Sequence, residues 1–319
     1  MDKMGEFVQD ALDCIEYANG PVTSKWGAVR AANGHPAPFN LQYIEIGNEN
    51  GGPKYHARYA LMHDAIQAKY PEIKIVSDFW NGPVKGRPQH IRDEHYYKSP
   101  DWFMTVGAKM YDSYPRGAFE VFVGEYAVTQ DVGRWGELRA AIGEAAFMCA
   151  LERNADVVKL AAYAPLFANA KHTAWKPNLI YPMTDGNFVN PSWNVQKLFS
   201  ENRGTDVVKV DVKTPSIRLT RFRAWKNDVQ TNVIDCVQAS AMRTAGGGTV
   251  LKLVNCAETP QRVEIRGLTG EAARTLFTGP GRDAHNAPFE PEALKEKTDR
   301  VQLPATLTLP PLSLSIYTL

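Results

Sequence analysis

The first two thirds of the chain alternate between two periodic patterns of apolar residues. Segment 5–18 places Phe7, Leu12 and Ile15 on one helical face, whereas segment 73–77 is a short β-branched run typical of strands. Strands that alternate with helices of this length indicate a parallel sheet or barrel. The expected helices are 5–18, 56–69, 101–111, 138–153 and 191–200, and the expected strands are 41–46, 73–77, 91–95, 121–124 and 157–163.

The pattern changes near residue 205, where short β-favouring runs replace the helical spacing. Turn signals, such as the three glycines 246–248, separate these runs. Regularly spaced strands with turns between them are typical of an antiparallel sandwich. The expected strands are 207–212, 232–241, 249–254, 262–267, 273–278 and 312–319. We therefore predict an α/β domain over residues 1–205 and an all-β antiparallel sandwich over residues 206–319.

Two of the expected strands end in glutamates. Run 43–46 is followed by Asn48 and Glu49 and then by two glycines, and run 121–124 directly precedes Glu125. Strands of a parallel barrel end in this way when they present a carboxylate to an active site. A single glutamate after a strand is more often a solvated surface residue, but hydrolysis of a glycosidic bond needs a pair of them. The repeated ending therefore favours a catalytic pair.

Composition excludes several other classes of function. The chain has 319 residues, of which 44% are hydrophobic, and a formal net charge of +1, so charge gives no case for nucleic acid or an anionic membrane surface. No apolar run approaches the roughly 20 residues of a membrane span. The N-terminus has no signal-peptide pattern, so we expect a cytoplasmic protein.

Cofactor and metal motifs are missing from the sequence. The glycine clusters lack the lysine of a phosphate loop, and the histidines lack the spacing of a metal pair. The cysteines have neither metal-ligand nor redox spacing, and we expect free, buried thiols at Cys14, Cys149, Cys236 and Cys256. The sequence therefore predicts no cofactor and no metal.

Five motifs follow one another in a fixed order within the first domain. They are YIEIGNENGG (43–52), YPEIKI (70–75), DEHYY (93–97), GEYAV (124–128) and AAYAPLF (161–167). Together they resemble the α-L-arabinofuranosidases of glycoside hydrolase family 51, in the branch that includes plant enzymes. The likeness is dense over residues 1–205 and weaker beyond. It implies a (β/α)₈ barrel with catalytic glutamates on strands four and seven, and retention of anomeric configuration.

The resemblance also implies roles for single residues. Glu49 matches the acid/base and Glu125 the nucleophile, and Asn48 matches the residue that hydrogen-bonds the sugar 2-hydroxyl. The other residues that it implies at the sugar site are His95, Tyr96, Tyr97, Trp175 and Asn178. One step of register decides whether Tyr96 or Tyr97 faces the nucleophile. Trp175 fits a carbohydrate platform and ordinary packing equally well.

Strands one to three of such a barrel have no counterpart before residue 41, where only helix 5–18 and a long loop are expected. Five strands would form a partial TIM-type (β/α) barrel with exposed edges at 41–46 and 157–163. A truncated sequence, completion by another protomer, and a shortened enzyme with a more open site all explain this. Because exposed apolar edges usually find a partner, we expect a homo-oligomer.

The expected function is that of a retaining glycoside hydrolase, an α-L-arabinofuranosidase acting on plant cell-wall arabino-oligosaccharides by double displacement. Two alternatives stay open. An open half-barrel would accept longer chains, which suits a β-glycan hydrolase of the same clan, such as an endoglucanase or xylosidase. A non-catalytic carbohydrate-binding fragment would instead keep only aromatic surfaces such as Trp80, Trp102 and Trp175.

Overall fold

The computed structural model describes residues 3–80, 82–223 and 228–319. Their contacts divide the chain into two compact units. The first unit comprises Met1–His95, Pro115–Gly124 and Lys159–Ala161, and the second comprises Tyr96–Tyr114, Glu125–Val158 and Ala162–Leu319.

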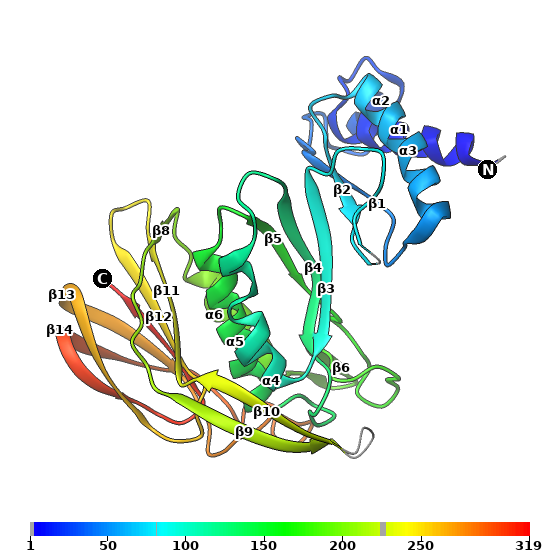
Figure 1. Cartoon of the computed structure of the whole chain (residues 1–319). Coiled ribbons are helices and arrows are strands. Elements are labelled where there is room, and N and C mark those ends of the chain that lie inside the picture. Colours follow the sequence, from blue (N-terminus) through cyan, green and yellow to red (C-terminus); the bar gives the residue numbers. More distant parts are fainter. Residues whose placement is uncertain (1–2, 81, 224–227) are drawn as a thin grey trace. The chain divides into compact units, whose positions relative to one another are not determined.

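A five-stranded parallel sheet forms the first part of the fold, in the order β1-β2-β3-β4-β5 (Figure 1). Its strands are β1 (Tyr43–Ile46), β2 (Lys74–Asp78), β3 (Ile91–Lys98), β4 (Glu120–Val128) and β5 (Val158–Tyr163). Strand β2 pairs in parallel with both β1 and β3. Parallel neighbours need long crossovers, and helices lie in those from β1 to β2, from β3 to β4 and from β4 to β5, whereas the described residues between β2 and β3 contain no helix. The expected partial (β/α) barrel is confirmed.

Three helices accompany β1 and β2 in the first unit (Figure 1): α1 (Met4–Asn19), α2 (Lys25–Ala32) and α3 (Gly52–Lys69). Tyr59 and Ile66 of α3 and Ile75 of β2 are fully buried in one apolar cluster. Ile46, the last residue of β1, belongs to the same cluster, which anchors the strand from which the chain enters the loop that carries Glu49.

Helix α2 lies in the segment that we predicted to be a long loop, and that prediction is wrong. Ser24 caps the helix, since its hydroxyl accepts the main-chain N–H of Gly27 at 3.1 Å. Arg30 is completely buried and donates to three main-chain carbonyls at 2.8 to 3.0 Å. One guanidinium thus satisfies carbonyls that a compact loop would leave unpaired.

The second unit contains the remaining helices, which are α4 (Pro100–Trp102), the π-helix η1 (Phe103–Gly107), the 3₁₀-helix η2 (Met110–Ser113), α5 (Leu138–Arg153) and α6 (Pro191–Glu201). Helix α5 is buried along most of its length because α6 and strands of the β-domain pack against it. Within it, Glu144 accepts the main-chain N–H of Val128 at 2.8 Å. Burial raises the pKa of Glu144 to about 7. The helix thereby holds the end of β4.

The C-terminal part is antiparallel. Its six-stranded sheet has the order β14-β13-β15-β12-β11-β8, and a two-stranded sheet pairs β10 with β9. The strands are β8 (Asp206–Val208), β9 (Ser216–Arg223), β10 (Asp228–Asp235), β11 (Val237–Arg243), β12 (Thr249–Asn255), β13 (Gln261–Phe277), β14 (Lys297–Leu309) and β15 (Ser313–Thr318). The expected antiparallel β-domain is confirmed. We keep the division of the chain near residue 205 as a proposal.

Individual strands of this domain differ from those predicted. Segment 232–241 forms parts of two strands, β10 and β11, because the chain turns at Cys236. Segments 262–267 and 273–278 instead belong to one strand, β13, whose register with β14 shifts between Ile265 and Gly270. The sequence patterns also do not predict β9, β14 or the hairpin of β6 (Ile180–Met183) and β7 (Gly186–Val189).

Two further expectations concern membranes and cysteines. No helix in the described part of the chain is long and apolar enough to cross a membrane. All four cysteines are free, and three are buried as expected, whereas Cys14 is exposed on α1.

Candidate active site

Glu49 lies in the loop that connects β1 to α3, next to the exposed Asn48. The chain leaves β1 at Gly47, which has a φ of 98° and on which a Cβ would lie 2.7 Å from the ring of Tyr55. Glu49 itself has a φ of 50°, an uncommon conformation for a residue of this type. Such backbone strain persists only where the surroundings hold it in place, and it concentrates at functional sites.

Tyr55 and Asp78 hold this loop. The Tyr55 hydroxyl donates to the carbonyl of Ile46 at 2.6 Å and accepts the Asp78 N–H at 2.9 Å, which links the ends of β1 and β2. The Asp78 carboxylate in turn accepts the N–H of Asn50, the residue after Glu49, and that of Trp80. Burial raises the pKa of Asp78. The loop is thus fixed on both sides of Glu49.

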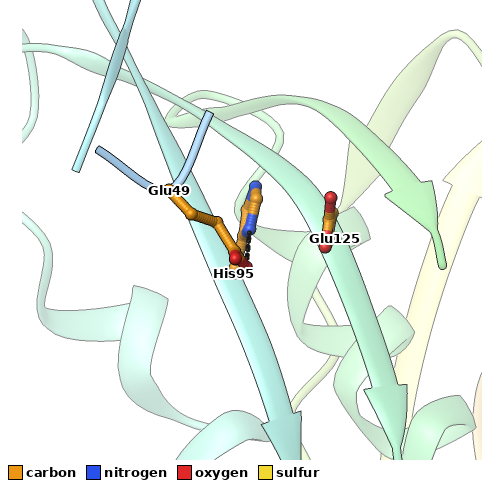
Figure 2. Close-up of side chains that lie close together, drawn as sticks. All are labelled: Glu49, His95 and Glu125. Carbon is orange, nitrogen blue, oxygen red and sulfur yellow. Dashed lines mark hydrogen bonds and ion pairs between the residues drawn. The ribbon is translucent and has the colours of Figure 1, made fainter. Parts of the chain in front are cut away.

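His95 lies between two carboxyl groups. Its Nδ1 is 3.1 Å from Oε1 of Glu49, the contact that Figure 2 shows as a dashed line, and its Nε2 is 2.6 Å from Oδ2 of Asp93. Asp93 and His95 are two residues apart in β3 and therefore point to the same face. Their side chains are only 2% and 3% exposed, whereas that of Glu49 is 37% exposed. A buried carboxyl group thus orients the ring that contacts a solvent-accessible one.

Glu125 lies inside β4, which continues to Val128, and not at the tip of the strand as we predicted (Figure 2). The Tyr97 hydroxyl donates a hydrogen bond to Oε2 of Glu125. The carbonyl of Tyr97 accepts from the side-chain amide of Gln130 at 3.0 Å. These contacts fix both the end of β3 and the direction of the Glu125 carboxyl group.

Tyr96 points to the opposite face of β3 from Tyr97. Its ring stacks on that of Trp102, with 5.0 Å between the centroids, and meets Phe147 of α5 edge-on at 6.1 Å. The register therefore gives Tyr97, and not Tyr96, the contact with Glu125. The structure places Tyr96 in an aromatic cluster on the helix side of the strand, away from that carboxyl group.

Trp175 and Asn178 lie in the loop after β5. Trp175 is 51% exposed, and its ring meets that of Tyr97 edge-on at 5.1 Å between the centroids. Asn178 is buried and donates to the carbonyl of Trp175 at 2.6 Å and to the hydroxyl of Thr173 at 3.3 Å. Trp175 thus offers an exposed aromatic surface beside Tyr97, and Asn178 holds the loop that carries it.

Three acidic residues that we did not predict as site residues belong to the same surroundings: Glu45, Asp78 and Asp93. Glu45 keeps contact with solvent, yet partial burial and the charge of the hydrogen-bonded Asp93 raise its pKa to about 8. A signal for Asp93 is present in the sequence. The alternation that places His95 and Tyr97 on one face of β3 places Asp93 there as well.

A metal site is the alternative interpretation of these side chains. Glu49 and His95 carry atoms of the kind that coordinate cations. Both ring nitrogens of His95 are already within hydrogen-bonding distance of carboxyl oxygens, however. A histidine held in this way is suited to orienting a carboxyl group and exchanging a proton with it. The contacts of His95 within the first unit therefore favour acid–base chemistry over metal coordination.

Comparison with known sequences identifies the family. The model of the α-L-arabinofuranosidase 1 domain matches residues 1–116, and that of the α-L-arabinofuranosidase C-terminal domain matches residues 124–313. An extracellular exo-α-L-arabinofuranosidase of Streptomyces chartreusis is 45% identical over 294 residues, which cover 86% of this chain and 32% of the relative. For α-L-arabinofuranosidase 1 of Arabidopsis thaliana the identity is 33% over 320 residues, with coverages of 98% and 46%. The chain thus spans 32% to 46% of the length of these curated relatives.

Solved structures agree with the sequence matches. An arabinose-bound family 51 α-L-arabinofuranosidase resembles this structure with a TM-score of 0.83 at 29% identity, over 99% of this chain and 51% of that one. The arabinose complex of the Thermotoga maritima α-L-arabinofuranosidase shares the fold, with a TM-score of 0.77 at 22% identity over 98% and 73% of the two chains. With both family models matched, the chain belongs to the α-L-arabinofuranosidases of glycoside hydrolase family 51.

Proposed function

We propose that this chain carries the catalytic pair of a retaining hydrolase that releases α-L-arabinofuranosyl units from plant cell-wall arabino-oligosaccharides. The main support is strand β3, on one face of which His95 contacts Glu49 and Tyr97 contacts Glu125. One strand thus contacts both glutamates, which supports two carboxyl groups that act on one glycosidic bond. Retention requires the two carboxyl groups to lie about 5 Å apart.

Each glutamate has a distinct role in the proposed double displacement. Glu125, oriented by the Tyr97 hydroxyl, attacks the anomeric carbon while the protonated Glu49 gives its proton to the leaving oxygen. The resulting glycosyl-enzyme ester is then attacked by water, which loses a proton to Glu49. Cleavage of the ester bond frees the Glu125 carboxylate and leaves Glu49 protonated again. Two inversions at the anomeric carbon give net retention.

An exposed group near each glutamate supports a sugar site. Trp175 offers an aromatic face next to Tyr97, and a sugar ring can pack its C–H face against such a surface. Asn48 is exposed directly before Glu49, where its amide can reach a hydroxyl of the bound sugar. The relatives named α-L-arabinofuranosidases favour arabinose over glucose or xylose as that sugar.

The substrate is tested with a panel of aryl glycosides and polysaccharides. We expect release of 4-nitrophenol from the α-L-arabinofuranoside and of arabinose from arabinan, measured by initial rates and product analysis. Release of cello-oligosaccharides from β-glucan without arabinose from arabinan would favour a β-glycan hydrolase. Binding of arabino-oligosaccharides in calorimetry with no turnover at high protein concentration would favour a non-catalytic binding protein.

We further propose that the chain forms homo-oligomers through the outer strands of its parallel sheet. Strands β1 and β5 are the first and last strands of that sheet, and Leu160 on β5 is exposed. Exposed apolar side chains on a sheet edge favour self-association. We expect light scattering on a size-exclusion column to give a mass well above the 35.5 kDa of one chain.

Two leucine variants test where the chains meet. Leu160→Arg is expected to lower the mass towards that of the monomer. Leu61→Arg, which changes an exposed leucine on α3, is expected to leave it unchanged. A single species of 35.5 kDa for the unmodified chain at micromolar concentration would contradict the proposal.

A further inference from the structure

Asp93 forms hydrogen bonds with groups on three strands of the first unit. Its Oδ2 lies 2.6 Å from Nε2 of His95, and its Oδ1 accepts the main-chain N–H of Gly124 at 2.8 Å. Its carboxyl group also hydrogen-bonds that of Glu45 on β1. The side chain is only 2% exposed, so these contacts are made almost without water. One carboxyl group thus joins β1, β3 and β4.

Gly124 provides a second, independent indication that this arrangement is built around Asp93. A Cβ at position 124 would lie 2.1 Å from Oδ1 of Asp93, so any other side chain would displace the carboxyl group. The backbone at Gly124 is not in the left-handed region, which means that the glycine serves to leave room. Gly124 directly precedes Glu125 in the chain.

We propose that Asp93 is a positioning residue, which holds a proton on Nε2 of His95 and thereby turns Nδ1 towards Glu49. Through Gly124 the same carboxylate fixes the backbone from which Glu125 extends. The inference rests on the proposed function, because it assigns to Asp93 a part in the acid–base step of Glu49.

The chemistry follows from the two ring nitrogens. With the Nε2 proton committed to Asp93, Nδ1 is the nitrogen that can exchange a proton with Glu49. The proton then lies either on Glu49, which donates to a neutral ring, or on Nδ1, which donates to the Glu49 carboxylate. His95 can therefore store the proton that Glu49 needs, and no proton is gained or lost within the pair.

Two further acidic residues lie around Asp93 and His95. Glu45 faces Asp93 from β1 and Asp78 faces it from β2, where it is the direct register partner of Asp93. The ring of Trp80 lies edge-on to that of His95, with 6.1 Å between the centroids. Partial burial and the charge of Asp93 raise the pKa of Glu45 to about 8, which favours the protonated form that donates to Asp93. His95 is the basic group that faces these three carboxyl groups.

The first test reads the protonation of His95 without turnover. In the ¹⁵N spectrum of the imidazole nitrogens, assigned by loss of signals in His95→Gln, we expect Nε2 to be protonated in the unmodified chain between pH 5 and 8. Asp93→Asn is expected to produce a mixture of tautomers. A neutral ring with its proton on Nδ1 in the unmodified chain would overturn the proposal, and the spectrum that decides is that of the unmodified chain.

The second test uses the pH profile of kcat/KM. Asp93→Asn is expected to lower kcat/KM by roughly 10- to 100-fold and to move the alkaline limb to lower pH, because Glu49 loses its proton store. Asp64→Asn is the matched control, since Asp64 is an exposed aspartate of the same unit that pairs with Arg87. An Asp93→Asn profile that coincides with that of the control would overturn the proposal. If Glu49→Ala and Glu125→Ala kept full activity, the proposed function would fail instead, and the ¹⁵N measurement would still decide the role of Asp93.

Discussion

Replacement of Glu125 by alanine is expected to lower kcat for an aryl α-L-arabinofuranoside by about 10⁴- to 10⁶-fold, the loss that follows removal of a catalytic nucleophile. The variant lacks the carboxylate that forms the bond to the anomeric carbon. Tyr97 and the helix that holds the end of β4 stay in place. Initial rates at saturating substrate measure the effect, and circular dichroism checks that the variant is folded.

Glu120→Ala is the matched control for this variant. Glu120 begins the same strand and pairs with Lys74 at 3.3 Å, with a partly exposed side chain. Because exposed ion pairs contribute little to stability, activity should stay within about twofold of the unmodified chain. Equal losses in both variants would point to damage of β4, and an active Glu125→Ala variant would exclude Glu125 as nucleophile.

The contacts of β3 show how far a sequence pattern predicts side-chain positions. Adjacent aromatic residues at 96 and 97 leave the register open, because one step moves every side chain to the other face. The packing of Tyr96 on Trp102 fixes that step, and Trp102 lies in a separate helix. The resemblance predicts His95 at the sugar site, but its contact with Glu49 is seen only in the structure. The role of Asp93 likewise depends on Gly124 and Glu45, which are distant in sequence.

Dependence on residues that are distant in sequence also explains where the fold differs from the one predicted. Residues 20–39 are rich in glycine, proline and alanine, and the eight-residue helix α2 forms because Ser24 caps it and the buried Arg30 holds it. Strand β14 contains Pro304, which argues against a central strand. It occupies the edge of its sheet, where a missing N–H is tolerated. Tertiary position therefore decides what local propensity leaves open, whereas long periodic elements such as α5 are predicted with both ends correct.

Replacement of Glu49 by alanine is expected to affect substrates according to their leaving groups. Natural arabino-oligosaccharides need protonation of the leaving oxygen, so their hydrolysis should fall by about 10²- to 10⁴-fold, the contribution of general acid–base catalysis. An activated aryl glycoside leaves without a proton, so its first step should be nearly unaffected. The glycosyl-enzyme should then accumulate, because no base activates water, and stopped-flow absorbance should show a burst of phenol.

Azide separates the two glutamates by the configuration of the product. In Glu49→Ala the shortened side chain leaves room for azide, which needs no base to attack the glycosyl ester at Glu125. Turnover should recover, and nuclear magnetic resonance should show a glycosyl azide with the anomeric configuration of the substrate. In Glu125→Ala azide replaces the nucleophile itself, so one displacement should give the opposite anomer. If Glu49→Ala gave the inverted azide, the roles of Glu49 and Glu125 would be exchanged. Full hydrolysis of oligosaccharides by Glu49→Ala without azide would show that its carboxyl group is not the acid, whatever the contact with His95 suggests.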